Sequence, residues 1–113
     1  MKKFIVIYHA TPEAVKQMAA ATPKQQAKGM EGWMKWAQKS GDQLVDMGSP
    51  LMHGELISPD GTSKKSRKGV NGYSIVQAES LEKAKKLFKG HPHLKSNAQC
   101  TIEVHEVMPL PGM

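Results

Sequence analysis

Cysteine is almost absent from this chain, since Cys100 is the only one among 113 residues. A single thiol excludes a disulfide framework and any zinc site built from the cysteines of one chain. Aromatic residues make up only 5%, and no apolar run approaches the roughly 20 residues of a membrane-spanning helix. The glycines form neither of the common phosphate-binding loops, G-x-x-x-x-G-K and G-x-G-x-x-G.

The N-terminal segment does not have the pattern of an export signal. Its apolar run, Phe4 to Tyr8, is shorter than the hydrophobic core of a secretory signal peptide. A free cysteine is typical of reducing compartments. The sequence therefore predicts a cytoplasmic protein with no membrane association.

Composition and charge indicate one globular domain over residues 1–113. Hydrophobic residues make up 39% and charged residues 23%, which is ordinary for a folded soluble chain. Lysine and arginine number 16 against 10 aspartates and glutamates, so the formal net charge is +6. An excess of this size permits binding to polyanions but does not demonstrate it.

The first half of the chain predicts one strand followed by two helices. The run Phe4–Tyr8 is short, apolar and β-branched, which is typical of a strand buried on both faces. Thr11 before Pro12 predicts the start of a short helix over residues 12–20. Thr22, with Gln25 three residues later, forms a capping box and predicts a longer helix that ends at Gly41. Met30 and Met34 are expected on its apolar face.

The second half predicts three strands and one helix. Residues 43–57 are read as a strand interrupted by glycine and proline, near a sheet edge, and residues 58–71 as an exposed loop or hairpin tip. A strand follows over residues 72–78. Ser80 then caps a helix that stops at Gly90, and a last strand begins at Cys100.

The order β-α-β-β-α-β favours a ferredoxin-like α+β fold, with an antiparallel sheet and both helices on one face. Strands such as 4–8 and 74–78 are apolar on both faces, so the second face needs a cover. A second copy of the chain would supply it. We therefore expect a homodimer whose sheets pack face to face.

Several segments resemble the YCII-related (DGPF-domain) family. Residues 1–8 are similar to the family's opening strand, and residues 72–76 with 78–84 resemble its third strand and second helix. Residues 90–94 and 102–107 are similar to its closing turn and last strand. The resemblance covers nearly the whole chain and rests on the succession of these motifs. It implies a dimeric α/β-barrel assembly and little about chemistry.

The same resemblance implies a paired histidine and aspartate in some members, and this sequence matches neither. The histidine position falls at Gly32 or Trp33, and His91 precedes the proline of the closing turn. In the loop, Asp60-Gly61 is followed by Thr62 instead of the proline of the family motif. Catalysis by an inherited dyad is therefore not expected, and whether the protein is an enzyme stays open.

The candidate functional side chains are mostly histidines. His91 and His93 flank Pro92, at a predicted helix C-terminus where an imidazolium is favoured. His9 and His91 are the candidate catalytic acid or base. The candidate lining of a ligand pocket is Tyr8, Trp33, His53 and His93. The alternative is that these residues pack: His91-Pro92-His93 is then a polar turn, and Trp33 with Trp36 belongs to the core. The spacing indicates no metal site, and no cofactor is expected.

A basic run supplies the alternative function. Four cations, Lys64, Lys65, Arg67 and Lys68, lie within five residues of the predicted hairpin tip. They could contact phosphates, but no recognition motif or interleaved aromatic residue accompanies them, so nucleic acid is not the expected partner. Two functions are thus consistent with the sequence. One is a homodimer with a cavity for a small organic molecule. The other is a non-catalytic module that binds a protein or nucleic acid through its dimer surface or basic loop.

Overall fold

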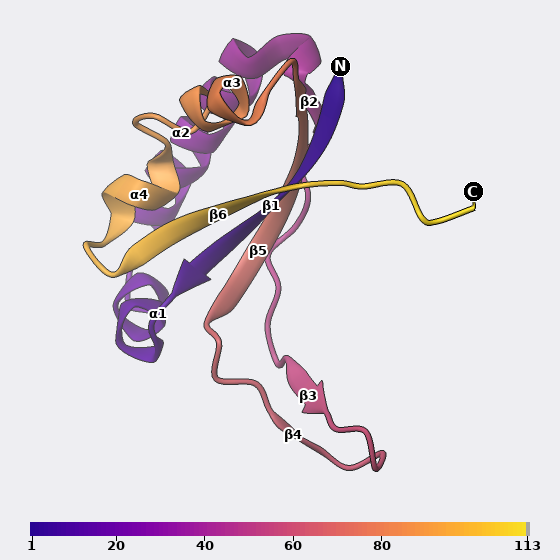
Figure 1. Ribbon diagram of the computed structural model, residues 1–113. Helices are drawn as coiled ribbons and strands as arrows, with labels where there is room; N and C mark the ends of the chain where they lie inside the picture. Colours follow the sequence, from indigo (N-terminus) through magenta and orange to yellow (C-terminus); the bar gives the residue numbers. More distant parts are fainter. Residues whose placement is uncertain (113) are drawn as a thin grey trace.

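A four-stranded antiparallel sheet forms the centre of the structure, a computed structural model that describes residues 1–112 (Figure 1). The strands are β1 (Lys2–Ala10), β2 (Leu44–Asp46), β5 (Val70–Ala78) and β6 (Cys100–Glu106). Their order across the sheet is β2-β5-β1-β6, and each neighbouring pair is antiparallel. The helices lie together on one side of this sheet in Figure 1. The predicted ferredoxin-like α+β fold is confirmed.

The central strand β1 is buried on one face only. Phe4, Val6 and Tyr8 are buried beneath the helices, whereas Ile5 is 36% exposed and Ile7 is half-buried. The continuous apolar run had predicted burial on both faces, and within this chain that prediction is wrong. The reason is that the helices cover a single face, so the side chains that alternate to the other face have no covering layer.

Two helices connect β1 to β2. Helix α1 (Pro12–Ala19) begins after Thr11, whose hydroxyl accepts a hydrogen bond from the backbone of Ala14, as the sequence predicted. Helix α2 (Pro23–Ser40) begins with the predicted capping box of Thr22 and Gln25. It ends at Gly41, and a short 3₁₀ turn, η1 (Gly41–Gln43), leads into β2. No helix within residues 1–112 has both the length and the apolar character needed to cross a membrane.

Two short helices, instead of one, connect β5 to β6. Helix α3 (Leu81–Lys86) begins at the predicted cap, Ser80. Helix α4 (Pro92–Ser96) occupies the segment that the sequence predicted as a polar turn. It forms because proline is favoured at the first helical position and because the side chain of His91 caps the helix N-terminus.

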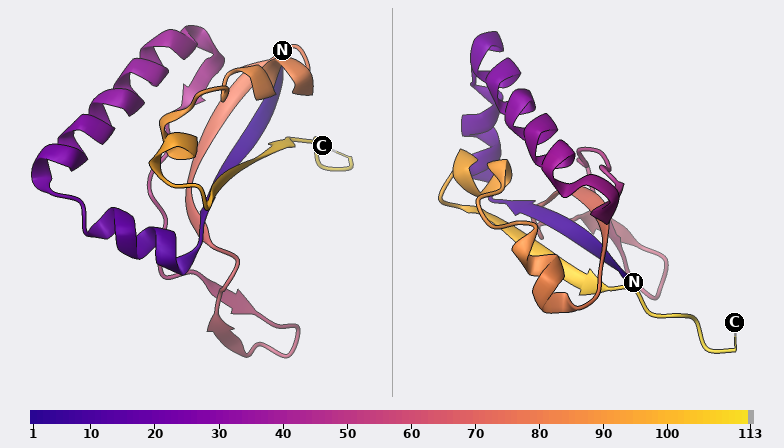
Figure 2. Two further views of the ribbon diagram at one scale, coloured as in Figure 1. Left: turned by 90° about the vertical axis from the view of Figure 1, so that its left-hand side faces the viewer. Right: turned by 90° about the horizontal axis from the view of Figure 1, so that it is seen from above.

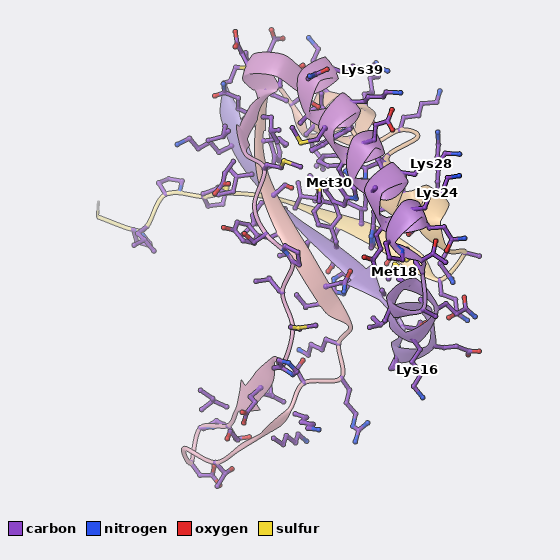
Figure 3. All side chains as sticks on the ribbon, turned by 180° about the vertical axis from the view of Figure 1, so that it is seen from behind. Lys16, Met18, Lys24, Lys28, Met30 and Lys39 are labelled. Carbon is purple, nitrogen blue, oxygen red and sulfur yellow. The ribbon has the colours of Figure 1, made fainter. Side chains whose placement is uncertain are left out.

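Helix α2 does not bury the face that the sequence predicted. Met30 is 58% exposed and Met34 47% exposed, whereas Trp36 is buried and Trp33 half-buried. Figure 3 shows Met30 on one side of α2, opposite Lys28. The two indoles take the core position because aromatic rings bury more apolar area than the methionine side chains would.

The interrupted strand over residues 43–57 divides between two sheets. Its first part is the edge strand β2, which has an irregular register against β5, as predicted for an edge. Its last part, β3 (Glu55–Ile57), pairs with β4 (Ser63–Lys65) in a separate hairpin. This hairpin and its two connections, residues 51–69, form an arm that extends beyond the end of the main sheet (Figures 1 and 2). The predicted exposed hairpin tip is confirmed.

The loop before the arm packs so closely on β5 that it requires glycine at position 48. Gly48 has φ 78, and a Cβ there would lie 1.7 Å from the carbonyl oxygen of Tyr73. We expect Gly48→Ala to lower the free energy of unfolding by about 2–4 kcal/mol, because backbone atoms must move. Gly61 is the matched control: its φ is 88, but a Cβ there meets open space. Gly61→Ala should cost only the backbone strain, about 1–2 kcal/mol. Urea denaturation of both variants checks this, and equal losses would contradict it.

Candidate functional site

A fully buried histidine lies where the helical segments meet the sheet. His91, between α3 and α4, has no exposed surface. Its ring centroid lies 4.4 Å from that of Trp33 and 4.5 Å from that of Trp36, both in edge-to-face geometry. The rings of Tyr8 and Phe88 contact it at 5.3 and 5.6 Å. We call these five residues the His91 cluster, and it joins β1, α2 and the α3–α4 segment.

The hydrogen bonds of His91 define its protonation state. Its Nδ1 accepts the backbone N–H of His93 at 3.0 Å, which caps helix α4. The proton of the neutral ring therefore resides on Nε2, and this buried atom has no hydrogen-bond partner among the described residues. Burial, and secondarily the nearby His93, lower the pKa of His91 to about 3. The expected imidazolium at a helix C-terminus is replaced by a neutral ring at a helix N-terminus.

His93 and His9 continue this chain of hydrogen bonds. The Nε2–H of buried His93 donates to the carbonyl oxygen of His9 at 2.9 Å. The Nδ1–H of His9 donates to the carbonyl oxygen of Lys68 at the base of the arm, also at 2.9 Å. The Nε2 of His9 lies 2.5 Å from Oε1 of Glu103. Hydrogen bonds from His9 and then from His105 lower the pKa of Glu103. His9 is thus brought together with the distant pair His91 and His93, and most of the ring nitrogens of these three histidines are already bonded.

The hydroxyl of Tyr8 is also occupied by a hydrogen bond. Ser74 Oγ donates to the carbonyl oxygen of Met47 at 2.6 Å, so the hydroxyl of Tyr8 donates to Ser74 Oγ at 2.8 Å. Burial raises the pKa of Tyr8 to about 12, although the hydrogen bond to Ser74 opposes part of this rise. Tyr8 therefore stays protonated near neutral pH and fixes the loop before the arm against β5.

A groove lies beside the His91 cluster, between α2 and the α3–α4 segment. Its volume is about 920 Å³. We call this groove the α2–α4 groove. Trp36 and Pro92 line it. Trp36 contacts His91, and Pro92 follows His91 in sequence, so these two residues lie between the buried imidazole and the groove. Its other lining residues are Gln25, Lys28, Gly29, Gly32, Lys35, Lys39, Ser40, Gln43, Lys86, Leu87, Lys89, Gly90, Lys95 and Ser96.

The candidate pocket residues from the sequence fall into different places. Tyr8, Trp33 and His93 gather around His91, and none of them lines the α2–α4 groove. His53 lies exposed in the arm with a φ of 60. Trp36, which the sequence paired with Trp33, does line the groove. Sequence reasoning missed the lysines of the groove, whose helical spacing on α2 is the signal that could have found them.

The remaining candidates are peripheral to the groove. The basic run, Lys64 to Lys68, lies on the arm, and its four cationic side chains are exposed. Cys100 is buried at the start of β6, as expected of a small apolar residue. Within residues 1–112, no three histidine, cysteine, aspartate or glutamate side chains gather in an arrangement that could hold a metal ion.

The fold and the site together define a ferredoxin-like α+β protein with a lysine-lined groove beside a buried imidazole. The chain belongs to the YCII-related family, whose domain matches residues 3–110. A similar solved structure is a 5-chloro-2-hydroxyhydroquinone dehydrochlorinase from Burkholderia phenoliruptrix AC1100, in complex with 2,5-dihydroxybenzoquinone. The TM-score is 0.52 at 13% sequence identity, over 89% of this chain and 90% of that one, which shows a shared fold. No curated protein matches this chain in sequence.

The family resemblance places a histidine–aspartate pair at Gly32 or Trp33 and at His91. Of these residues, Trp33 contacts His91, with ring centroids 4.4 Å apart. An indole and a neutral imidazole cannot exchange a proton as an imidazole and a carboxylate can. The contact at these positions is therefore a packing contact.

The buried neutral ring of His91 makes folding sensitive to acid. The unfolded chain takes up a proton at His91 near pH 6.5, but the folded chain does so only near pH 3. The free energy of unfolding therefore falls progressively as pH falls from 6.5 toward 3, because only the unfolded chain is protonated at His91 in this range. The loss between pH 6.5 and about pH 5 is about 2 kcal/mol.

The variant His91→Asn isolates this effect, because asparagine can still cap α4 but does not titrate. Urea denaturation of both proteins at several pH values should show a steeper loss in the parent chain below pH 6.5. Parallel pH profiles would contradict the assignment to His91.

Proposed function

We propose that this protein is a homodimer that binds a small organic molecule in the α2–α4 groove. The observation that carries the proposal is the groove itself, whose volume of about 920 Å³ lies within the range of small-molecule pockets, about 300–1,000 Å³. Trp36, Leu87 and Pro92 give the groove an apolar floor, and apolar contacts are typical of such sites. The unpaired thiol of Cys100 supports a cytoplasmic location.

The histidines favour binding over acid–base catalysis. With a pKa of about 3, the His91 ring is a weak base, and its Nδ1 is occupied in capping α4. Both ring nitrogens of His9 already face oxygen atoms, of Lys68 and Glu103. A general base needs a free nitrogen within reach of a substrate proton. The proposed role of these histidines is therefore to position the helices that form the groove.

The structural neighbour supports a small-molecule ligand on this fold. That protein was solved in complex with 2,5-dihydroxybenzoquinone, a small organic molecule. Fold similarity at 13% identity carries neither its substrate nor its dehydrochlorinase activity to this chain. What it supports is that a fold of this shape accommodates a ligand of that size.

The uncovered face of the sheet supports the homodimer. Ile5 pairs with Ile75 and Ile7 with Tyr73, so four apolar side chains adjoin on the face away from the helices. Figure 2 shows no helix over this face. A second copy would bury these residues against their own equivalents across a two-fold axis, as in most homodimers.

A charge on this face tests the homodimer. We expect light scattering of the parent protein to give twice the 12.4 kDa of one chain, and Ile5→Glu to give a monomer, because a buried carboxylate opposes association. Leu81→Glu is the control, since Leu81 is similarly exposed (43% against 36%) but lies on α3. A monomeric parent protein, or equal effects of the two variants, would refute the homodimer.

Filling the groove tests the binding site. In a thermal-shift screen of neutral, cationic and anionic metabolites, a ligand at 100 times its dissociation constant should stabilise the protein by about 2.7 kcal/mol. Gly29→Leu should abolish that shift, because its side chain projects into space that is empty beside Gly29. The unliganded variant should be no less stable than the parent, since leucine favours a helix by about 1 kcal/mol over glycine. Gly29→Ala is the conservative control and should keep most of the shift. If no metabolite gives a shift that Gly29→Leu removes, the groove is not the site.

A further inference from the structure

Lysine dominates the rim of the α2–α4 groove. Six lysines line it, three on each wall: Lys28, Lys35 and Lys39 from α2, and Lys86, Lys89 and Lys95 from the α3–α4 segment. No aspartate or glutamate is among the lining residues. Positive charge therefore lines both walls of the groove.

Most of this charge is not neutralised. Lys35 pairs with Glu31 at 3.4 Å. Within residues 1–112, the other five groove lysines have no carboxylate within ion-pair distance. On α3 and beside it, Lys83 and Lys85 are paired with Glu79 and Glu82, and these two lysines do not line the groove. The acidic side chains of this region thus neutralise lysines away from the groove and leave those around it free.

The sequence of α2 places its three groove lysines on one helix face. Positions 28, 32, 35 and 39 follow the spacing at which side chains line one side of a helix, and position 32 is glycine. Figure 3 shows Lys28 on the side of α2 opposite Met30. The result is a row of ammonium groups interrupted by bare backbone.

Gly29 opens the wall further, without a packing reason in this chain. A Cβ at Gly29 would meet nothing within 4 Å, whereas one at Gly32 would touch Pro92 at 3.5 Å. Glycine in the middle of a helix destabilises it relative to alanine. A glycine that costs stability and contacts nothing leaves room for a ligand to approach the helix backbone closely.

We infer that the ligand of the α2–α4 groove is a small organic polyanion, with at least two phosphate or carboxylate groups and an apolar part. This inference rests on the proposed function and names its ligand class. Uncompensated lysines on two facing walls repel one another, and an anion between them relieves that repulsion. A ligand with a single charge would satisfy one wall only. The apolar part lies against the floor of Trp36, Leu87 and Pro92.

Isothermal titration calorimetry with three probes tests the inference: ATP, inorganic triphosphate and the uncharged nucleoside adenosine. We expect ATP to bind, triphosphate to bind more weakly because it lacks the apolar part, and adenosine not to bind. Raising the salt from about 50 mM to about 300 mM should weaken ATP binding several-fold, because the lysines are exposed and screened by ions.

Two double variants of equal charge locate the site. Lys28→Gln with Lys86→Gln removes one cation from each wall and should weaken ATP binding about tenfold. Lys64→Gln with Lys68→Gln removes two cations from the arm and should leave ATP binding unchanged. All four lysines are exposed, so both proteins should keep the parent circular dichroism spectrum and melting temperature.

The outcomes separate this inference from the proposed function. If ATP and triphosphate fail to bind, or adenosine binds as tightly as ATP, the polyanion inference is overturned. The proposed function would still stand if a neutral or cationic metabolite gave a shift that Gly29→Leu removes. If only the arm variant loses ATP binding, the basic run on the arm is the anion site and the inference is also overturned. If no metabolite of any charge gives a shift sensitive to Gly29→Leu, the proposed function and the inference fail together.

Discussion

Burial of the His91 ring is the constraint on which the arrangement of the helices depends. The ring packs between Trp33 and Trp36 of α2, while its Nδ1 caps α4. The indole N–H of Trp36 donates to the carbonyl oxygen of Leu87 at 2.8 Å and ties α2 to the end of α3. Through His93, which donates to the carbonyl of His9, the same segment is attached to β1. These contacts fix the separation between α2 and α4, and therefore the width of the groove.

The same burial decides what the histidine can do chemically. An imidazole surrounded by aromatic rings loses the solvation that its charged form needs, so it stays neutral. One nitrogen is used in capping, and the other points into apolar surroundings. The indole of Trp33, which contacts this ring, cannot exchange a proton with it. The ring therefore serves packing, and the available charge lies on the lysines of the neighbouring groove.

Much of the fold could be predicted because its signals lie in residues that are close in sequence. The caps at Thr11, Thr22 and Ser80 and the stop at Gly41 act within a single turn of helix, and all were found where the sequence indicated. The order of strands and helices then leaves few topologies. Local patterns failed where one helix offers two apolar faces. Met30 and Met34 repeat at helical spacing and form an apolar face on α2, but the larger rings of Trp33 and Trp36 pack against His91 and take the core position.

The candidate site was less predictable than the fold, because its parts are far apart in sequence. Lys28 and Lys86 face one groove although 58 residues separate them, and His9 reaches His93 across 84. By itself, the sequence determined the family, the helix caps, the alternation of strands and helices, and the excess of positive charge. Only the tertiary structure decided which face of β1 is covered, that His91 is neutral and buried, and that unpaired lysines surround one groove. The physical reason is that burial, desolvation and the combined effect of neighbouring charges depend on distances through space, which local patterns along the chain do not specify.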